Sequence, residues 1–173
     1  PIDLTRVRSA TLHFWIWYDI EPGFDYGYVE ASTDAGKTWS TLRATDTTAN
    51  NPNGQNYGTG FTGESGGSIA MWVPESVDLT RFAGQNILLR FEYVTDDSFN
   101  GDGFAIDGVE IPEIGFRDSP DRNDGWVADG FTLVDNRVTQ RYLVELIDST
   151  SPNPVSITAV SSDGRATIGV RPG

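Results

Sequence analysis

Several short segments of this chain alternate between apolar and polar residues, and this period of two restricts the fold more than any other feature. In segment 10–18, every second side chain from Leu12 to Tyr18 is large and apolar, and segment 86–95 repeats the pattern. Successive side chains of a β-strand point to opposite faces, so each segment predicts a strand with one face in a core. Clusters of Gly, Asn and Asp separate the segments. We therefore predict an all-β fold, an antiparallel β-sandwich of jelly-roll-like form.

The same reasoning places the remaining strands and the domain limits. The predicted strands cover residues 10–18, 26–33, 37–44, 86–95, 103–111, 130–135, 140–147, 155–160 and 166–170. Residues 45–68 form a long polar stretch that predicts a loop. Pro152 and Pro154 mark a linker or wide turn, because proline forbids regular ladder pairing. We predict one β-sandwich module over residues 1–173, with 147–173 as a candidate C-terminal hairpin extension that is too small to fold alone.

Charge and residue usage exclude several classes of function. The sequence has 25 acidic and 12 basic residues and a formal net charge of −13, which repels nucleic acid and anionic membranes and attracts cations. No apolar run approaches the roughly 18 residues of a membrane helix, so we predict no membrane insertion. Cysteine is absent and His13 is the single histidine, which excludes disulfides, thiolate zinc sites and a paired-histidine zinc motif. We therefore predict that the chain is not an enzyme.

One short motif predicts a structural turn. Residues 32–39 read Ser-Thr-Asp-Ala-Gly-Lys-Thr-Trp and resemble the Asp-box, S-x-D-x-G-x-T-W, of secreted β-modules. Asp34 can accept backbone N–H bonds within the turn, Gly36 can adopt a positive φ, and Trp39 can pack over the hairpin. The resemblance implies a structural turn remote from catalysis, so we predict a structural role for Asp34.

Two acidic loops, residues 18–26 and 96–107, offer oxygen ligands for a metal ion. The second has nearly the spacing of a calcium-binding loop, although strands rather than helices flank it. Ca²⁺ takes several oxygens close together, and burying such carboxylates without a cation would be costly. The alternative is that these carboxylates are solvated or pair with arginines. We predict structural Ca²⁺ as the cofactor, and its candidate ligands are Glu21, Asp25, Asp96, Asp102 and Asp107.

Asp107 carries a further expectation about stability. It lies inside the apolar run 103–111, so we expect its carboxylate to enter partly buried space. A buried carboxylate persists only when it is paired, hydrogen-bonded or bound to metal. We therefore expect Asp107→Ala to destabilise the fold more than Asp34→Ala, since Asp34 is expected on an exposed turn.

Several stretches in one order resemble a known family. They are WYDIEPGFDYGYVEASTDAGKTW, TGFTGESGG, VDLTRFAGQNILLRFEYVTDD, GDGFAIDGVEI and GWVADGFTLVDNRVTQRYLVELI. From Ala10 to Ile147 the chain is similar to the non-catalytic β-sandwich region of immune inhibitor A-type proteins of the M6 metallopeptidase family, and MAM-like modules share part of the pattern. The resemblance implies a bacterial protein, secreted or on the cell surface, that binds calcium structurally. The zinc motif H-E-x-x-H of that family is absent, so the resemblance implies no peptidase activity for this chain.

These observations predict an accessory module of a larger secreted protein, a peptidase by resemblance, with the other domains of that parent protein as partners. Because the chain begins at Pro1, we expect it to be a fragment. Two alternatives stay open at this point. One is a carbohydrate-binding module that uses aromatic platforms, for which the sequence offers Trp15, Trp17, Trp72 and Tyr57. The other is a structural or adhesive domain that binds a surface protein.

Overall fold

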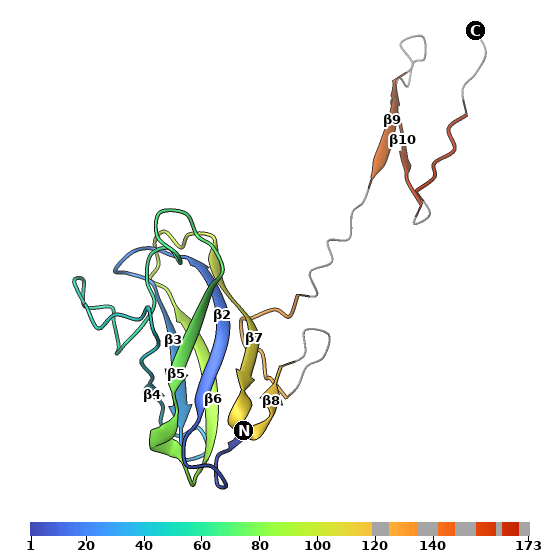
Figure 1. Ribbon diagram of the computed structural model, residues 1–173. Helices are drawn as coiled ribbons and strands as arrows, with labels where there is room; N and C mark the ends of the chain where they lie inside the picture. Colours follow the sequence, from blue (N-terminus) through green and yellow to red (C-terminus); the bar gives the residue numbers. More distant parts are fainter. Residues whose placement is uncertain (119–124, 135–141, 148–154, 162–163, 170–173) are drawn as a thin grey trace. The chain divides into compact units, whose positions relative to one another are not determined.

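The computed structural model of the chain describes residues 1–118, 125–134, 142–147, 155–161 and 164–169. The chain divides into two compact units, Pro1–Leu133 and Val134–Gly173 (Figure 1). The second unit contains strands β9 (Leu143–Ile147) and β10 (Val155–Ala159), which pair in antiparallel fashion. The hairpin expected within 147–173 therefore has its first strand almost entirely ahead of residue 147.

The described residues of the first unit form two antiparallel β-sheets of four strands each, in the orders β1-β6-β3-β4 and β5-β2-β7-β8. The strands are β1 (Ile2–Asp3), β2 (Thr11–Asp19), β3 (Tyr26–Ser32), β4 (Ser40–Thr41), β5 (Val73–Asp78), β6 (Asn86–Val94), β7 (Gly103–Ile111) and β8 (Phe116–Arg117). Within the described ranges, the helical segments are the short 3₁₀ turns η1 (Thr80–Phe82) and η2 (Pro112–Ile114), and no helix is long and apolar enough to cross a membrane. The predicted all-β antiparallel sandwich is confirmed.

The core lies between the two sheets and follows from the alternation along β2. Buried and exposed residues alternate along this strand, as the sequence pattern predicts. Phe14 of β2 is 2% exposed and meets Phe91 of β6, on the opposite sheet, edge to face with ring centroids 5.2 Å apart. The apolar face of each sheet is therefore buried against the other sheet, which is the arrangement that stabilises a sandwich.

The polar stretch 45–68 has no long strand but contributes one aromatic side chain to this core. Phe61 is fully buried, and its ring contacts Phe14 and Tyr18 with centroid separations of 6.5 and 5.5 Å. Its backbone exchanges two hydrogen bonds with Gly27 of β3, of 3.0 and 2.8 Å. The stretch is thus a covering segment of the sandwich and not a detached loop.

Three strand predictions differ from the structure. Residues 37–44 contain only the two-residue β4, because the turn at 32–39 takes up the first part of that range. Residues 130–134 and 166–169 form no strand; residues 135 and 170, which end those predictions, lie outside the described residues. Conversely, β5 was not predicted, since Pro74 lies within it. Proline is tolerated there because β5 is an edge strand, where a backbone N–H can face away from the ladder.

Gly27 leaves room for the ring of Phe104, and this close approach leads to a prediction. A Cβ built on Gly27 would overlap the Phe104 ring, which is itself stacked on Tyr93 with centroids 5.9 Å apart. We expect Gly27→Ala to lower the free energy of unfolding by about 1–3 kcal/mol, since overpacking forces the ring or the strand to move. Urea unfolding midpoints measure this loss. Gly169→Ala is the matched control, because its added Cβ meets nothing within 4 Å, and equal midpoints would contradict the prediction.

Candidate metal centre

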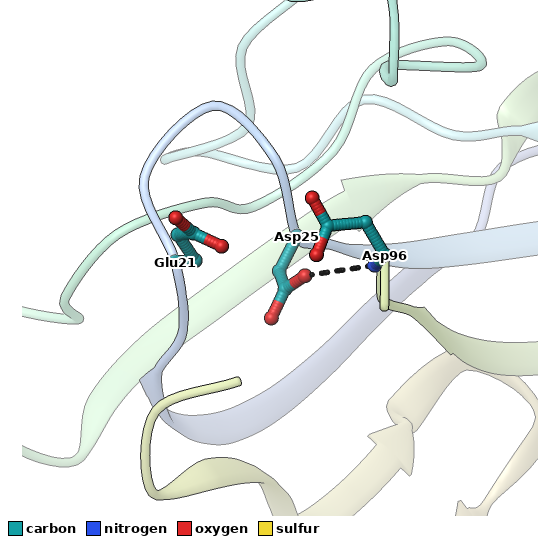
Figure 2. A group of neighbouring side chains, drawn as sticks. All are labelled: Glu21, Asp25 and Asp96. Carbon is teal, nitrogen blue, oxygen red and sulfur yellow. Dashed lines mark hydrogen bonds between the residues drawn. The ribbon is translucent and has the colours of Figure 1, made fainter. Parts of the chain in front are cut away.

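Three of the five predicted ligands lie together in the first unit. One carboxylate oxygen each from Glu21, Asp25 and Asp96 lies within 4.8 Å of the other two (Figure 2). Asp25 directly precedes β3, and Asp96 follows the end of β6. Because β3 and β6 are antiparallel neighbours with Tyr26 opposite Val94, the residues just beyond these strand ends meet. The register of the sheet therefore brings two of the three carboxylates together.

A tight turn between β2 and β3 adds the third carboxylate. The backbone N–H of Asp25 donates to the Glu21 carbonyl at 3.0 Å, which closes the turn. Gly23 adopts a φ of +78° within it, a conformation that favours glycine. The Gly23 N–H donates to the Thr62 hydroxyl at 2.8 Å, and that hydroxyl donates to the Glu21 carbonyl at 3.3 Å. The covering segment 45–68 thus holds the turn that carries Glu21 in place.

Asp25 is the buried centre of the group. Its side chain is fully buried, its Oδ2 accepts a hydrogen bond from the Tyr93 hydroxyl at 2.9 Å, and its Oδ1 accepts one from the Asp96 N–H at 3.2 Å. Each carboxylate oxygen has a second lone pair. Asp25 can therefore bind a cation while it keeps both hydrogen bonds.

Glu21 supplies the observation that points to a missing partner. Its Oε2 is buried and has no hydrogen-bond partner. Burial, together with the neighbouring charges of Asp96 and Asp25, raises the pKa of Glu21 above its ordinary value. In the part of the chain that the structure describes, no lysine or arginine forms an ion pair with these three carboxylates. The group fits a hard, oxygen-binding cation such as Ca²⁺, which would satisfy the buried oxygen and offset the repulsion.

The other two predicted ligands, Asp102 and Asp107, are exposed and do not belong to this group. The expectation that Asp107 enters partly buried space is wrong. Phe104 and Ile106 face inward opposite Tyr18 and Ile16, but the ladder between β2 and β7 then shifts its register. Gly108, at a φ of +60°, lies at this bulge. Asp107 precedes the shift, opposite Trp15, and ordinary alternation from Phe104 and Ile106 turns it to solvent. The extra residue changes the face of the side chains that follow, so Val109 and Ile111 are the buried ones.

The turn at 32–39 is held by the carboxylate of Asp34. Its Oδ1 accepts hydrogen bonds from the Thr38 N–H at 2.9 Å and the Ser32 hydroxyl at 2.8 Å, and its Oδ2 accepts one from the Thr38 hydroxyl at 2.7 Å. These bonds, with those from Thr38 foremost, lower the pKa of Asp34 to about 2. A carboxylate whose folded-state pKa is lowered stabilises the fold above its ordinary pKa, and this stabilisation is lost as the pH falls through the folded value.

We expect Asp34→Ala to lower the melting temperature more than Asp107→Ala at pH 7, the reverse of the order expected from the sequence. Asp34 ties three donors to one turn, whereas Asp107 accepts a bond from the adjacent Gly108 N–H and is otherwise exposed. The effect of Asp34→Ala should shrink as the pH falls toward 2, where the carboxyl is protonated in the folded protein. Thermal melts at pH 7 and pH 2 test both statements. A larger loss in Asp107→Ala at pH 7 would refute them.

The aromatic platforms named for carbohydrate binding differ in exposure. Trp15 and Trp72 are 48% and 46% exposed, and Tyr57 is 70% exposed, whereas Trp17 is half-buried on β2. Tyr57 and Trp39 line an open pocket together with Arg90, Glu30 and Glu92. Arg90 forms ion pairs with both glutamates there. Trp15, Trp72 and Tyr57 lie at the surface, and carbohydrate binding stays a prediction.

Tyr93 is the member of the site that sequence reasoning missed. The alternation of segment 86–95 assigns it to the apolar face, and its ring does pack on Phe104. Its hydroxyl, however, donates to Asp25. A tyrosine at the end of an apolar strand next to an acidic loop is the available signal, because a buried hydroxyl needs a partner.

The sequence of this chain is similar to those of known proteins. The sequence model described as "Immune inhibitor A-like, MAM domain" matches residues 1–136. The chain is 28% identical over 113 residues to Bacillopeptidase F of Bacillus subtilis (strain 168), covering 65% of this chain and 6% of that protein. It is 29% identical over 135 residues to the pre-pro-metalloprotease PrtV of Vibrio cholerae serotype O1, covering 76% of this chain and 14% of PrtV. It is 27% identical over 134 residues to Immune inhibitor A of Bacillus thuringiensis subsp. alesti, covering 76% of this chain and 18% of that protein. The chain thus spans less than a fifth of the length of each of these relatives.

Proposed function

Because this chain belongs to the immune inhibitor A-like MAM domain family, we propose that it is a non-catalytic, calcium-stabilised accessory module of a secreted bacterial peptidase. In this role the sandwich is one domain of a longer protein, and its partners are the other domains of that protein. Calcium does not take part in a reaction here. It ties the turn before β3 to the end of β6 and so stabilises one end of the sheet.

The relatives support the peptidase part of this proposal. Their names describe a bacillopeptidase and a metalloprotease, and the matched region is a small fraction of each. The chain itself has no H-E-x-x-H motif, and its single histidine, His13, lies exposed on β2. Within the described residues no hydrogen bond joins His13 to a carboxylate or a hydroxyl, and such an exposed histidine is poorly suited to acid–base chemistry. An accessory role fits both observations.

The buried, unpartnered Oε2 of Glu21, beside the fully buried Asp25, is the observation that carries the calcium part. Carboxylates that cannot reach water or a hydrogen-bond donor destabilise the folded state unless a cation binds. The folded-state pKa of Glu21 is raised, so without a cation its ionisation disfavours folding above that pKa. Ca²⁺ needs the ionised form, and its binding should therefore weaken as the pH falls.

We expect Ca²⁺ to raise the melting temperature of the whole chain, because a cation that binds only the folded state stabilises it by mass action. At a free Ca²⁺ concentration of 100 times the dissociation constant, the gain is about 2.7 kcal/mol. Calorimetry at pH 7.5 in EDTA and then in millimolar Ca²⁺ measures it. Mg²⁺ serves as the control, since it demands a tighter octahedral set of ligands. A transition that Ca²⁺ leaves unchanged would remove the calcium part of the proposal.

A further inference from the structure

We propose a second cation site in the first unit, formed by Glu75 of β5 and Asp46 of the segment that runs along this strand. It shares no residue with the Glu21, Asp25 and Asp96 group. Its ligand is a divalent, oxygen-binding cation, for which Ca²⁺ is the probe. Its role would be to fasten the start of the covering segment 45–68 to the edge of the sheet.

Glu75 is a carboxylate directed into the sandwich. It lies opposite Phe14 of β2 in the ladder, and residues directly opposite each other in antiparallel strands share a face. Its side chain is 3% exposed. Its Oε1 is buried and has no hydrogen-bond partner, while its Oε2 accepts a long bond of 3.3 Å from the Asp46 N–H. A buried carboxylate oxygen without a donor needs an explanation in any native fold.

The segment that carries Asp46 runs along β5 residue by residue. Ala44 forms an isolated antiparallel bridge with Val77, and the Thr45 hydroxyl lies 3.4 Å from the Ser76 hydroxyl. The N–H of Asp46 then reaches Glu75. Residues 44, 45 and 46 thus meet residues 77, 76 and 75 in turn. The Asp46 and Glu75 side chains therefore lie beside each other at the sheet edge, and Asp46 is exposed. One carboxylate therefore faces the interior and the other faces solvent.

The charges around Glu75 are all acidic. Burial and the Asp46 carboxylate raise the pKa of Glu75 to about 7, and the Tyr18 hydroxyl is the other titratable group close to the pair. None of the ion pairs in the described ranges involves Glu75. When both are ionised, the two carboxylates have no counter-ion within the described residues. Ca²⁺ accepts two carboxylates and completes its shell with carbonyls and water, so it would neutralise the pair and reach the unpartnered Oε1.

The test counts bound ions on the whole chain by equilibrium dialysis at pH 8. We expect two Ca²⁺ per wild-type chain, one per chain of Glu75→Gln and of Asp46→Asn, and one per chain of Asp25→Asn. Glu75→Gln keeps the shape of the side chain and removes its charge, and near-UV circular dichroism checks its fold. If Glu75→Gln does not fold, the ion count of Asp46→Asn tests the site instead, because position 46 is exposed and its substitution should leave the fold intact. From pH 8 to pH 6 the affinity of the Glu75 site should fall about tenfold, because Glu75 then takes up its proton.

The outcomes separate the two sites. Wild-type binding of one ion that Glu75→Gln abolishes would support this site and count against the Glu21, Asp25 and Asp96 group. Unchanged ion counts in both Glu75→Gln and Asp46→Asn would overturn the proposal. That result would mean that the two carboxylates bind no cation.

Discussion

Replacing Phe61 with alanine is expected to lower the free energy of unfolding by about 3–5 kcal/mol, the range for removing a buried phenylalanine ring. The ring is fully buried and contacts Phe14, Tyr18 and Phe104 with centroid separations of 6.5, 5.5 and 6.4 Å. Its loss leaves a cavity between the two sheets and weakens the attachment of segment 45–68. A loss of this size would leave many domains of this length marginally folded.

Tyr57→Ala is the matched control for this prediction. It removes the other aromatic side chain of the same polar segment, but Tyr57 is 70% exposed, so the loss should stay within about 0.5 kcal/mol. Urea unfolding of both variants, followed by tryptophan fluorescence, measures the difference. Equal losses would show that the segment is detached in solution and that Phe61 does not belong to the core.

Replacing Asp25 with asparagine is expected to abolish the stabilisation by Ca²⁺ from the Glu21, Asp25 and Asp96 group, about 2.7 kcal/mol at 100 times the dissociation constant. Asparagine keeps an acceptor oxygen for the Tyr93 hydroxyl or the Asp96 N–H and removes the charge at the centre of the group. In EDTA the variant should therefore melt close to the wild type. In Ca²⁺ its melting temperature should be lower than that of the wild type, since the cation loses a charged ligand.

Asp25→Ala distinguishes metal binding from packing at the same position. It removes both acceptors, so the Asp96 N–H loses its partner and the Tyr93 hydroxyl keeps only the Asn100 carbonyl at 3.2 Å, which costs about 1–3 kcal/mol even in EDTA. Melting curves in EDTA and in Ca²⁺ for Asp25→Asn and Asp25→Ala are compared. Both variants are also made in a chain that carries Asp46→Asn, which removes the second site. If Ca²⁺ then stabilises both variants as much as it stabilises the Asp46→Asn chain alone, Asp25 is not a ligand.

Local patterns were sufficient for the strands that form the centre of each sheet. The alternation of 10–18 and 86–95 predicted β2 and β6 to within one residue at each end, and β7 was predicted with its observed bounds. Short elements were harder to predict. Residues 37–44 have strand-like composition, yet only Ser40 and Thr41 pair, because pairing depends on a partner that the local sequence does not contain.

In the candidate site, too, local features were predictable and features that depend on strand pairing were not. Glu21, Asp25 and Asp96 were recognisable as loop carboxylates between strands, which is a local property of the sequence. Asp107 was assigned to the wrong face, because the alternation along β7 reverses just after it: Phe104 and Ile106 face the core before the register shift, and Val109 and Ile111 face it after the shift. The apolar run around Asp107 conceals this shift. A bulge depends on how two strands pair, and neither strand alone reveals it.

The sequence by itself determined the fold class, the central strands and the acidic loops, because a period of two and the choice of turn residues act over neighbouring positions. The tertiary structure alone decided which of those acidic residues meet, that Phe61 of a polar segment is buried, and that Glu75 points inward beside Asp46. Each of these depends on contacts between residues far apart in the chain. Such contacts are set by strand order and register, and these emerge only when both sheets bury their apolar faces together.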